Sequence, residues 1–376
     1  MIELKERKNK VLFIVSELKP GGMERVVLNL AKDLKEKKHD PAVICIQGYG
    51  VLAKDLKKSK IPVKSIGSYK SLDFKAVFVL GRYLRKIKPS IISIHDYSSL
   101  PYAVAASLLF YRVPLVFTGH GLLYEGFENL KKRYRFFSQF LSGFSAVSQE
   151  VAKRHKKFLN LKKNIEIIPN GVPFIKAGKT SELIREELGI KPDEIFYLAV
   201  GNPRPEKGFE DLIDAASLIL KNNRKKFKFK VFVAGTLNKS SYCEMLEKKI
   251  KEKKLENIVK FLGFRSDTAD LYDAADVFVL SSRSEGMPMV ILEAMMSGLP
   301  VVATKVGGVP STIRDTGILT ESANPQKLSE AMQEIIKNKD ELGKKTENLA
   351  QKEYSIDKMT DSYLSFFKKI VSGNNK

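Results

Sequence analysis

The chain has 376 residues, 43% of them hydrophobic, which is enough for two domains with their own cores and excludes a disordered protein. Lysine and arginine number 65 against 43 acidic residues, and the net charge of +22 favours anionic partners: nucleic acid, an anionic membrane face or phosphorylated small molecules. Cys45 and Cys243 form neither a disulfide framework nor a zinc-ligand spacing, so we expect a protein of a reducing compartment. No apolar run reaches membrane-spanning length after the charged stretch 1–10, so we expect neither a signal peptide nor a membrane span.

Apolar runs and helical patterns alternate along the first half of the chain. Runs typical of buried strands lie at 11–15, 42–46, 63–66, 91–94, 115–118 and 146–147. This alternation predicts a parallel sheet with helices on both faces. Ligands of such sheets bind beyond the carboxyl ends of the strands, so residues at those ends are candidates for a site.

Glycines and histidines follow three of these strands. Gly21 and Gly22 lie between the first strand and a helix, where a ligand can reach backbone amides, although neither the dinucleotide-binding nor the Walker glycine pattern is present. His95 follows the fourth predicted strand, and His120 lies between two glycines after the fifth. We expect His120 to bind a ligand, leave His95 open between ligand binding and a structural role, and expect no ligand role for the other two histidines.

A stripe of apolar residues at helical spacing lies between 130 and 144. Its members are Leu130, Tyr134, Phe137, Leu141 and Phe144, while Lys131, Lys132, Arg133 and Arg135 fall largely off the stripe. The pattern predicts one helix over 130–144. That helix either packs its stripe on the domain core or lies on an anionic membrane surface.

A second alternating series has strand-like runs at 195–200, 228–234, 259–262, 277–280 and 301–303. The loop after its first strand carries Arg204 and Lys207 beside glycines, an arrangement that suits phosphate binding. Aspartates spaced by three over 267–276 are interpreted as helical positions rather than as a metal site. The segment 356–370 has an apolar helical face that needs a partner.

Two acids flank a predicted helix start after the run at 277–280. Glu285 lies in the loop, Pro288 marks the start of a helix that ends before Gly298, and Glu293 lies within that helix. The helix start offers unpaired amides and the positive end of a dipole, which suit a phosphate. The carboxylates are acceptors matched to the hydroxyls of a sugar or a ribose.

Five motifs, in this order, resemble the retaining glycosyltransferases of family 4. They are Gly-Gly-Met-Glu-Arg at 21–25, Pro-Asn-Gly-Val at 169–172, Pro-Glu-Lys-Gly at 205–208, Leu-Tyr-Asp-Ala-Ala-Asp-Val at 271–277, and the Glu-x7-Glu element within 284–294. The resemblance implies an α/β protein of the GT-B fold, with two facing Rossmann-like domains, an interdomain cleft and a C-terminal crossover helix. It implies an acceptor-binding domain over 1–172, joined by helix 356–372, and a nucleotide-sugar-binding domain over 173–355.

The resemblance also implies roles for individual residues. Glu285, His120 and Lys207 match the catalytic positions, the first two near the transferred sugar and the lysine on the diphosphate. The implied donor-binding residues are Gly22, Arg204, Lys207, Glu285, Gly286, Met287, Pro288 and Glu293, the last on the ribose, and the candidates for acceptor binding are His95 and Glu24. Many members have arginine where this chain has Asn202, so Arg204 would serve from two positions further on, and Ser311 stands where many have an acid.

We therefore expect a retaining, metal-independent glycosyltransferase that needs no cofactor. It would move a hexose or N-acetylhexosamine from a nucleotide-diphosphate sugar, a UDP-sugar ahead of a GDP-sugar, to a glycan or lipid-linked glycan in cell-surface polysaccharide or glycolipid assembly. We expect it in the cytoplasm, attached peripherally to an anionic membrane face, and without a nucleic-acid partner because no recognised motif accompanies the charge. The alternatives are a nucleotide-sugar 2-epimerase of the same fold and a non-catalytic polyanion-binding protein.

Overall fold

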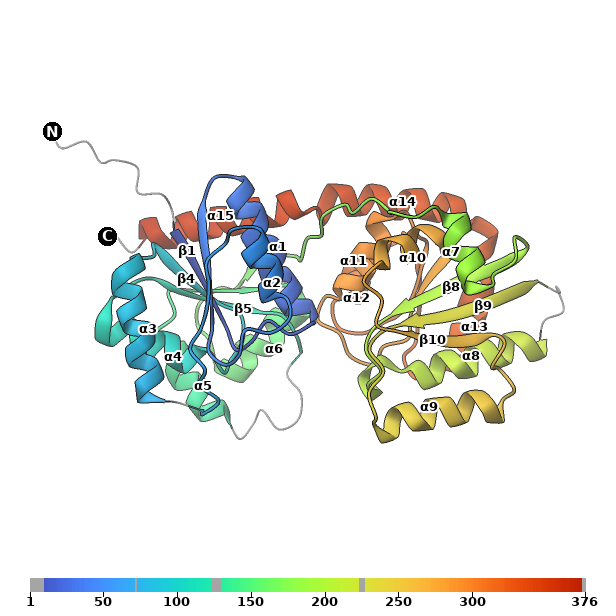
Figure 1. Ribbon diagram of the computed structural model, residues 1–376, viewed down its shortest axis with the longest axis horizontal. Helices are drawn as coiled ribbons and strands as arrows, with labels where there is room; N and C mark the ends of the chain where they lie inside the picture. Colours follow the sequence, from blue (N-terminus) through green and yellow to red (C-terminus); the bar gives the residue numbers. More distant parts are fainter. Residues whose placement is uncertain (1–9, 72, 123–129, 223–226, 374–376) are drawn as a thin grey trace. The chain divides into compact units, whose positions relative to one another are not determined.

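The computed structural model describes residues 10–71, 73–122, 130–222 and 227–373 (Figure 1). The chain divides into two compact units. Unit 1 comprises Met1–Gly171 and Ile356–Lys376, and unit 2 comprises Val172–Ser355. Each unit is built around one parallel sheet.

The sheet of unit 1 has seven strands in the order β3-β2-β1-β4-β5-β6-β7. The strands are β1 (Lys10–Val15), β2 (Asp40–Cys45), β3 (Val63–Ser65), β4 (Ile91–Ile94), β5 (Leu115–Gly119), β6 (Gly143–Ala146) and β7 (Glu166–Ile167). All neighbouring pairs are parallel, as the alternating pattern predicts. The order reverses between β1 and β4, and this switch point is where sheets of this kind bind ligands.

Helices cover the sheet of unit 1 and include one from the end of the chain. They are α1 (Gly22–Glu36), α2 (Ala53–Lys58), α3 (Phe74–Ile87), α4 (Leu100–Phe110), α5 (Lys131–Ser138), α6 (Gln149–Leu159) and α15 (Ile356–Gly373). Figure 1 shows α15, in red, beside α1, in blue, and Lys37, the C-cap residue of α1, forms ion pairs of 3.1 and 2.8 Å with Asp357 and Asp361 of α15. The apolar face of α15 is buried, including Tyr363 and Phe366, so this face has the partner that its pattern requires.

The single helix expected over 130–144 is wrong. The helix α5 ends at Ser138, three successive i→i+3 turns carry the chain to Leu141, and Phe144 lies in β6 beside Phe117 of β5. Tyr134, Leu141 and Phe144 are all buried. A helix followed by a turn and a strand therefore reproduces an apolar spacing that a longer helix would also give.

The sheet of unit 2 has six parallel strands in the order β10-β9-β8-β11-β12-β13. They are β8 (Glu194–Val200), β9 (Lys228–Ala234), β10 (Val259–Gly263), β11 (Val277–Leu280), β12 (Val301–Thr304) and β13 (Ile318–Thr320). Numbered from its first strand, this is the order 3-2-1-4-5-6 of a Rossmann-like sheet, with the switch point between β8 and β11. The first six strands of unit 1 have the same order.

The helices of unit 2 are α7 (Ser181–Leu188), α8 (Phe209–Asn222), α9 (Ser241–Glu252), α10 (Thr268–Ala274), α11 (Met289–Met296), α12 (Val309–Ile313), α13 (Pro325–Glu334) and α14 (Lys339–Glu353). Of these, α8 to α12 connect the strands in sequence order, α7 precedes the first strand, and α13 and α14 follow the last. The helix α10 confirms the helical interpretation of Asp270 and Asp273. The interpretation is wrong for Asp267, which is the N-cap residue of α10, and for Asp276, which lies beyond the helix and directly before β11. No helix in the described ranges is long and apolar enough to cross a membrane.

Candidate active site

The loops after β8 and β11 lie side by side at the switch point of unit 2. The backbone amide of Arg283 donates to the carbonyl of Glu206 at 2.8 Å, and Ser281 Oγ donates to the carbonyl of Lys207 at 3.0 Å. Gly208 has φ +59°, and a Cβ there would lie 2.3 Å from the carbonyl oxygen of Ser281. Glycine is therefore required where the two loops touch.

This contact brings together two residues that the sequence predicts as site residues. Lys207 Nζ lies 2.8 Å from Glu285 Oε1, and Ser282 Oγ donates to the same oxygen at 2.7 Å. The side chains are 25% and 10% exposed, so the ion pair is largely shielded from water. An ammonium has three N–H donors and a carboxylate has two acceptor oxygens, so each partner has capacity left for a ligand.

The helix α11 begins directly after this loop, as predicted. Pro288 is its N-cap residue with extended backbone, and Gly298, at φ +73°, lies just beyond its end. The loop is fixed at Gly286, whose carbonyl accepts from the amide of Gly308 at 3.0 Å. The first-turn amides of α11 therefore lie close in the chain to Glu285, at the positive end of the helix dipole.

Glu293 lies within α11 and is held by a tyrosine of α10. The Tyr272 hydroxyl donates to Glu293 Oε2 at 3.0 Å and lies 3.4 Å from the carbonyl of Val290. Its ring packs on Phe278 of β11, with the centroids 5.9 Å apart. Sequence spacing gives no signal for Tyr272 as a partner of Glu293, because the contact joins two different helices.

Arg204 does not join the Lys207–Glu285 pair. Its side chain is 65% exposed, and its guanidinium lies 3.9 Å from Glu206. Asn202, the departure from the family pattern, accepts from the amide of Thr236 at 2.8 Å and so connects the loop after β8 to the end of β9. The phosphate-binding role of Arg204 stays a prediction.

Arg283 had no role in the sequence-based prediction, although it lies two residues before Glu285. Its guanidinium lies 2.7 Å from Glu210 Oε1 and 3.0 Å from Asp211 Oδ2, both in the first turn of α8. Arg283 thus fastens the loop after β11 to the helix that follows Lys207.

A second group of predicted residues lies at the switch point of unit 1. The amide of Ser16, just after β1, donates to Asp96 Oδ2 at 2.6 Å and so joins the ends of β1 and β4. Gly22 is the first residue of α1, and a Cβ on Gly21 would lie 2.3 Å from Glu24 Oε2. The Glu24 carboxylate therefore turns back over the start of α1, where the helix dipole favours a negative charge.

His95 and His120 contact each other between β4 and β5. His95 Nδ1 lies 2.7 Å from His120 Nε2, and His95 Nε2 lies 2.9 Å from Ser93 Oγ. His95 is only 2% exposed, and both of its ring nitrogens already have a hydrogen-bond partner within the protein. Burial lowers the pKa of both rings, that of His120 to about 3, so both are neutral at physiological pH.

His155, for which no ligand role was expected, lies against the same loop. Its Nε2 lies 2.9 Å from the carbonyl oxygen of Gly121, and its Nδ1 lies 2.7 Å from the Tyr97 hydroxyl. Burial lowers the pKa of His155 as well. The residues around His155 are basic, which is typical of a solvated helix face. The sequence therefore gives no sign that His155 itself turns inward.

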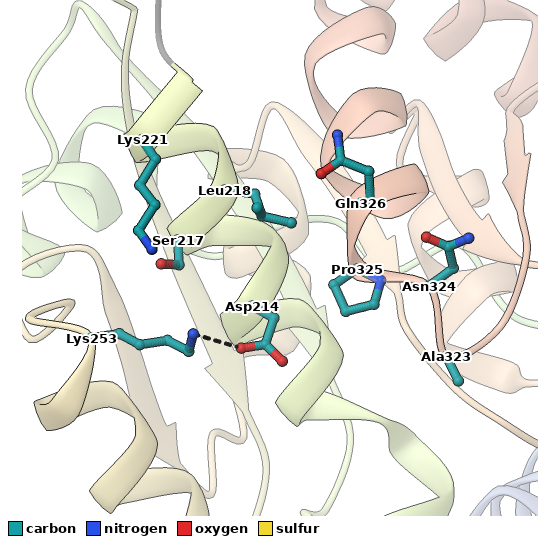
Figure 2. Close-up of a pocket in the computed structure, with 9 residues that line it drawn as sticks. All are labelled: Asp214, Ser217, Leu218, Lys221, Lys253, Ala323, Asn324, Pro325 and Gln326. Carbon is teal, nitrogen blue, oxygen red and sulfur yellow. Dashed lines mark ion pairs between the residues drawn. The ribbon is translucent and has the colours of Figure 1, made fainter.

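A pocket of 480 Å³ between α8 and α13 contains none of the predicted site residues (Figure 2). Asp214 on its wall lies 2.6 Å from Lys249 and 3.1 Å from Lys253, so its charge is already compensated. Among the described residues, no group of three or more histidine, cysteine or acidic side chains is arranged to hold a metal ion.

Comparison with known proteins decides the family. The family model described as "Glycosyltransferase Family 4" matches residues 20–174, and "Glycosyl transferases group 1" matches residues 180–355. A protein of Methanocaldococcus jannaschii, the uncharacterized glycosyltransferase MJ1178, is 30% identical over 321 residues, which cover 77% of this chain and 83% of that protein. The chain belongs to the family 4 glycosyltransferases. Its activity is therefore glycosyl transfer, as the resemblance implies.

Two further glycosyltransferase similarities extend over most of the chain. The Escherichia coli UDP-Gal:alpha-D-GlcNAc-diphosphoundecaprenol alpha-1,3-galactosyltransferase is 28% identical over 327 residues, 81% of this chain and 82% of that enzyme. The crystal structure of Anabaena HepE in complex with UDP-glucose has a TM-score of 0.83 at 23% identity, covering 96% of this chain and 99% of that one. This structural likeness confirms that the two Rossmann-like domains are those of the GT-B fold.

Proposed function

We propose that this glycosyltransferase moves a hexose or N-acetylhexosamine, with retention of configuration, from a nucleotide-diphosphate sugar to a glycan or lipid-linked glycan in cell-surface polysaccharide or glycolipid assembly. The proposal of a donor site rests on the Lys207–Glu285 ion pair beside the start of α11. A cation, a carboxylate and the amide end of a helix, brought together by two neighbouring loops, match a diphosphate joined to a hydroxylated sugar.

In this proposal the protein stabilises the leaving diphosphate with fixed charges. Lys207 and the amides at the start of α11 would bind the diphosphate oxygens, and Arg204 would turn in from solvent to add a second cation. Glu285 would accept from a hydroxyl of the transferred sugar and Glu293 from the ribose. The bond from the anomeric carbon to phosphate breaks and the bond to the acceptor oxygen forms on the same face, while a phosphate oxygen takes the acceptor proton.

A UDP-sugar is the donor that we favour over a GDP-sugar. The name of the E. coli relative specifies UDP-Gal, and HepE binds UDP-glucose. The experiment is a panel of UDP- and GDP-sugars followed by thermal unfolding, because a bound donor raises the unfolding midpoint by mass action. The best donor is then incubated with lipid-linked and free glycans, and the anomeric configuration of the product is read by NMR. An inverted product, or conversion of the sugar without an acceptor, would contradict the proposal, and the second result would favour an epimerase.

We infer the membrane attachment and the lipid-linked acceptor from one surface of unit 1. Large hydrophobic side chains are exposed on three neighbouring helices: Phe74, Phe78 and Val79 on α3, Leu108 and Leu109 on α4, and Leu130, Phe136 and Phe140 on and beside α5. We call these residues the aromatic face. Phe78 contacts Phe110 of α4 edge-on with the centroids 5.5 Å apart, and Arg133 donates to the carbonyl of Ser71 just before α3, so the three helices are joined.

Cations surround the aromatic face with few acids to balance them. From residue 73 to residue 150 the sequence has ten lysines and arginines against five acids. Arg82 lies over the ring of Phe78, 5.9 Å from its centroid, and Arg85 lies over that of Phe110 at 5.3 Å. Exposed aromatic rings beside cations fit the boundary between lipid headgroups and acyl chains. We therefore propose peripheral attachment to an anionic membrane, which would also supply a lipid-linked acceptor.

A further inference from the structure

Ser93, His95 and His120 form a hydrogen-bonded chain that runs from inside the sheet of unit 1 to the end of β5. Ser93 is fully buried, and the rings of His95 and His120 stack with their centroids 5.0 Å apart. At the outer end of the chain, His120 Nδ1 is buried and has no hydrogen-bond partner within the described ranges. A buried nitrogen without a partner is uncommon and indicates that a ligand completes the site.

We propose that Ser93 and His95 are positioning residues that hold His120 in the tautomer with hydrogen on Nδ1, so that this atom donates to an oxygen of the substrate. The role of His120 at the substrate rests on the proposed function. The assignment of the tautomer rests on the hydrogen-bonded chain alone.

A neutral imidazole has one donor nitrogen and one acceptor nitrogen, so the chain has two arrangements. In the first, Ser93 donates to His95 Nε2, His95 Nδ1 donates to His120 Nε2, and His120 carries its hydrogen on Nδ1. In the second, every bond is reversed, so that His120 Nε2 donates inward and Nδ1 becomes an acceptor.

The hydroxyl of Ser93 decides between the two arrangements. Among the described residues, His95 Nε2 is the only hydrogen-bond partner of Ser93 Oγ. The second arrangement would leave the buried hydrogen of Ser93 without an acceptor, at a cost of about 1–3 kcal/mol. In the first arrangement the one donor left over is His120 Nδ1–H, at the end of β5, where a sugar or phosphate oxygen can accept it.

His155 holds the same loop with the opposite tautomer. A carbonyl oxygen can only accept, so His155 Nε2 must carry the hydrogen that it donates to Gly121, and Nδ1 must accept from Tyr97. A Cβ on Gly119 would lie 3.0 Å from His155 Cε1, so the ring supports the loop on both sides of His120. His155 therefore supplies an internal standard for the tautomer of His120.

The test is nitrogen-15 NMR of the full chain labelled only at histidine, which contains four histidines. Long-range correlations to the ring protons distinguish the two tautomers, and substitution of His39, His95 and His155 in turn assigns the signals. We expect hydrogen on Nδ1 for His95 and His120 and on Nε2 for His155. Hydrogen on Nε2 of His120 in the unmodified protein would overturn the proposal.

A near-isosteric pair of variants tests the link from His95 to His120. In H95N the amide can still donate to His120 Nε2. The carboxylate of H95D, at a pH high enough to ionise it in this buried position, can only accept and would place hydrogen on that nitrogen. We expect H95N to keep hydrogen on Nδ1 of His120, and H95D to lose it and to have a kcat lower than that of H95N by about tenfold, the effect of one hydrogen bond. Equal kcat values in two folded variants with different tautomers would overturn the proposal.

The last experiment measures the same NMR signals with donor and acceptor substrates bound. Saturation with both should shift the Nδ1–H signal of His120 and leave that of His155 Nε2–H nearly unchanged. An unshifted His120 signal under turnover conditions would overturn donation to the substrate. Absence of transfer by the unmodified protein with every nucleotide sugar would instead count against the proposed function, since the tautomers are read without turnover.

Discussion

Lys207 and Glu285 are 78 positions apart in the sequence, yet Lys207 Nζ lies 2.8 Å from Glu285 Oε1. The parallel sheet explains this contact. The strands β8 and β11 are parallel neighbours, so their carboxyl ends lie at the same edge of the sheet. The loops that follow these ends therefore lie next to each other. The charged pair is therefore a consequence of the strand order, and Gly208 allows the two loops to approach closely enough to form it.

The first prediction concerns Tyr272, which donates to Glu293 at 3.0 Å. The substitution Tyr272→Phe keeps the ring on Phe278 and removes only the hydroxyl, so Glu293 loses a partner that fixes its position. We expect the KM for the nucleotide sugar to rise by about tenfold, the effect of one hydrogen bond to a charged group, with little change in kcat. Steady-state kinetics measure both values. A lowered kcat with an unchanged KM would show that Glu293 does not act in donor binding.

The second prediction concerns the aromatic face. The double variant Phe74→Ser, Phe78→Ser removes two exposed rings, the first of them 79% exposed, and should abolish flotation with anionic liposomes at low salt. The matched control is Phe264→Ser, which removes a ring that is 62% exposed in unit 2 and should float like the unmodified chain. Added salt should weaken binding, because each basic residue near the surface contributes about 1 kcal/mol of screened attraction. Failure of the unmodified chain to float at low salt would contradict membrane attachment.

The third prediction concerns pH and the buried histidines. The pKa of His120 is lowered to about 3 by burial, whereas that of an unfolded histidine is about 6.5. The unfolded state then binds more protons between these values, so stability is full above about pH 6.5 and falls as the pH decreases below it. Urea unfolding at pH 7.5 and pH 5.5 should show this loss, and His120→Asn should reduce it while His39→Gln should not. A free energy of unfolding that stays constant over this range would contradict the neutral, buried state of the rings.

The fourth prediction concerns α15. Phe366 is buried in unit 1, and its ring lies against Gly143 of β6, where an added Cβ would be 2.9 Å away. The substitution Phe366→Ala should therefore lower the free energy of unfolding by about 3–5 kcal/mol. The exposed Phe136, substituted by alanine, should change it by no more than about 0.5 kcal/mol. Equal effects of the two substitutions would show that α15 does not contribute to the core of unit 1.

Much of the fold could be predicted from local pattern. The strands at 91–94, 228–234 and 277–280 have the predicted bounds, because each is a short apolar run between polar residues or turns. The helix α11 was predicted because Pro288 and Gly298 mark its two ends. The edge strands β7 and β13 were not predicted, since a run of two or three residues gives too little pattern.

Apart from Glu293 within α11, most of the candidate site was predictable because it lies at the ends of strands. Glu285, Lys207, His95 and His120 all stand there, and strand alternation is visible in the sequence. Their partners could not be predicted, because Ser282, Tyr272 and Ser93 are ordinary polar residues whose importance lies in a contact. The position of His155 could not be predicted for a similar reason: its neighbours are basic and exposed, and only the three-dimensional structure shows that this ring turns inward to Gly121.

The most direct test of the central claim is the effect of the Lys207–Glu285 pair on transfer from the best nucleotide-sugar donor. We expect Lys207→Met and Glu285→Gln each to lower kcat by about 10²–10³-fold, because each removes one fixed group that stabilises the transition state. The thermal midpoint of each variant should change by no more than a few degrees. The matched control is Lys228→Met, which breaks the exposed 2.8 Å ion pair with Asp193 in the same unit and should retain full activity. Turnover by folded Lys207→Met and Glu285→Gln proteins within a few-fold of the control would contradict the assignment of this loop as the donor site.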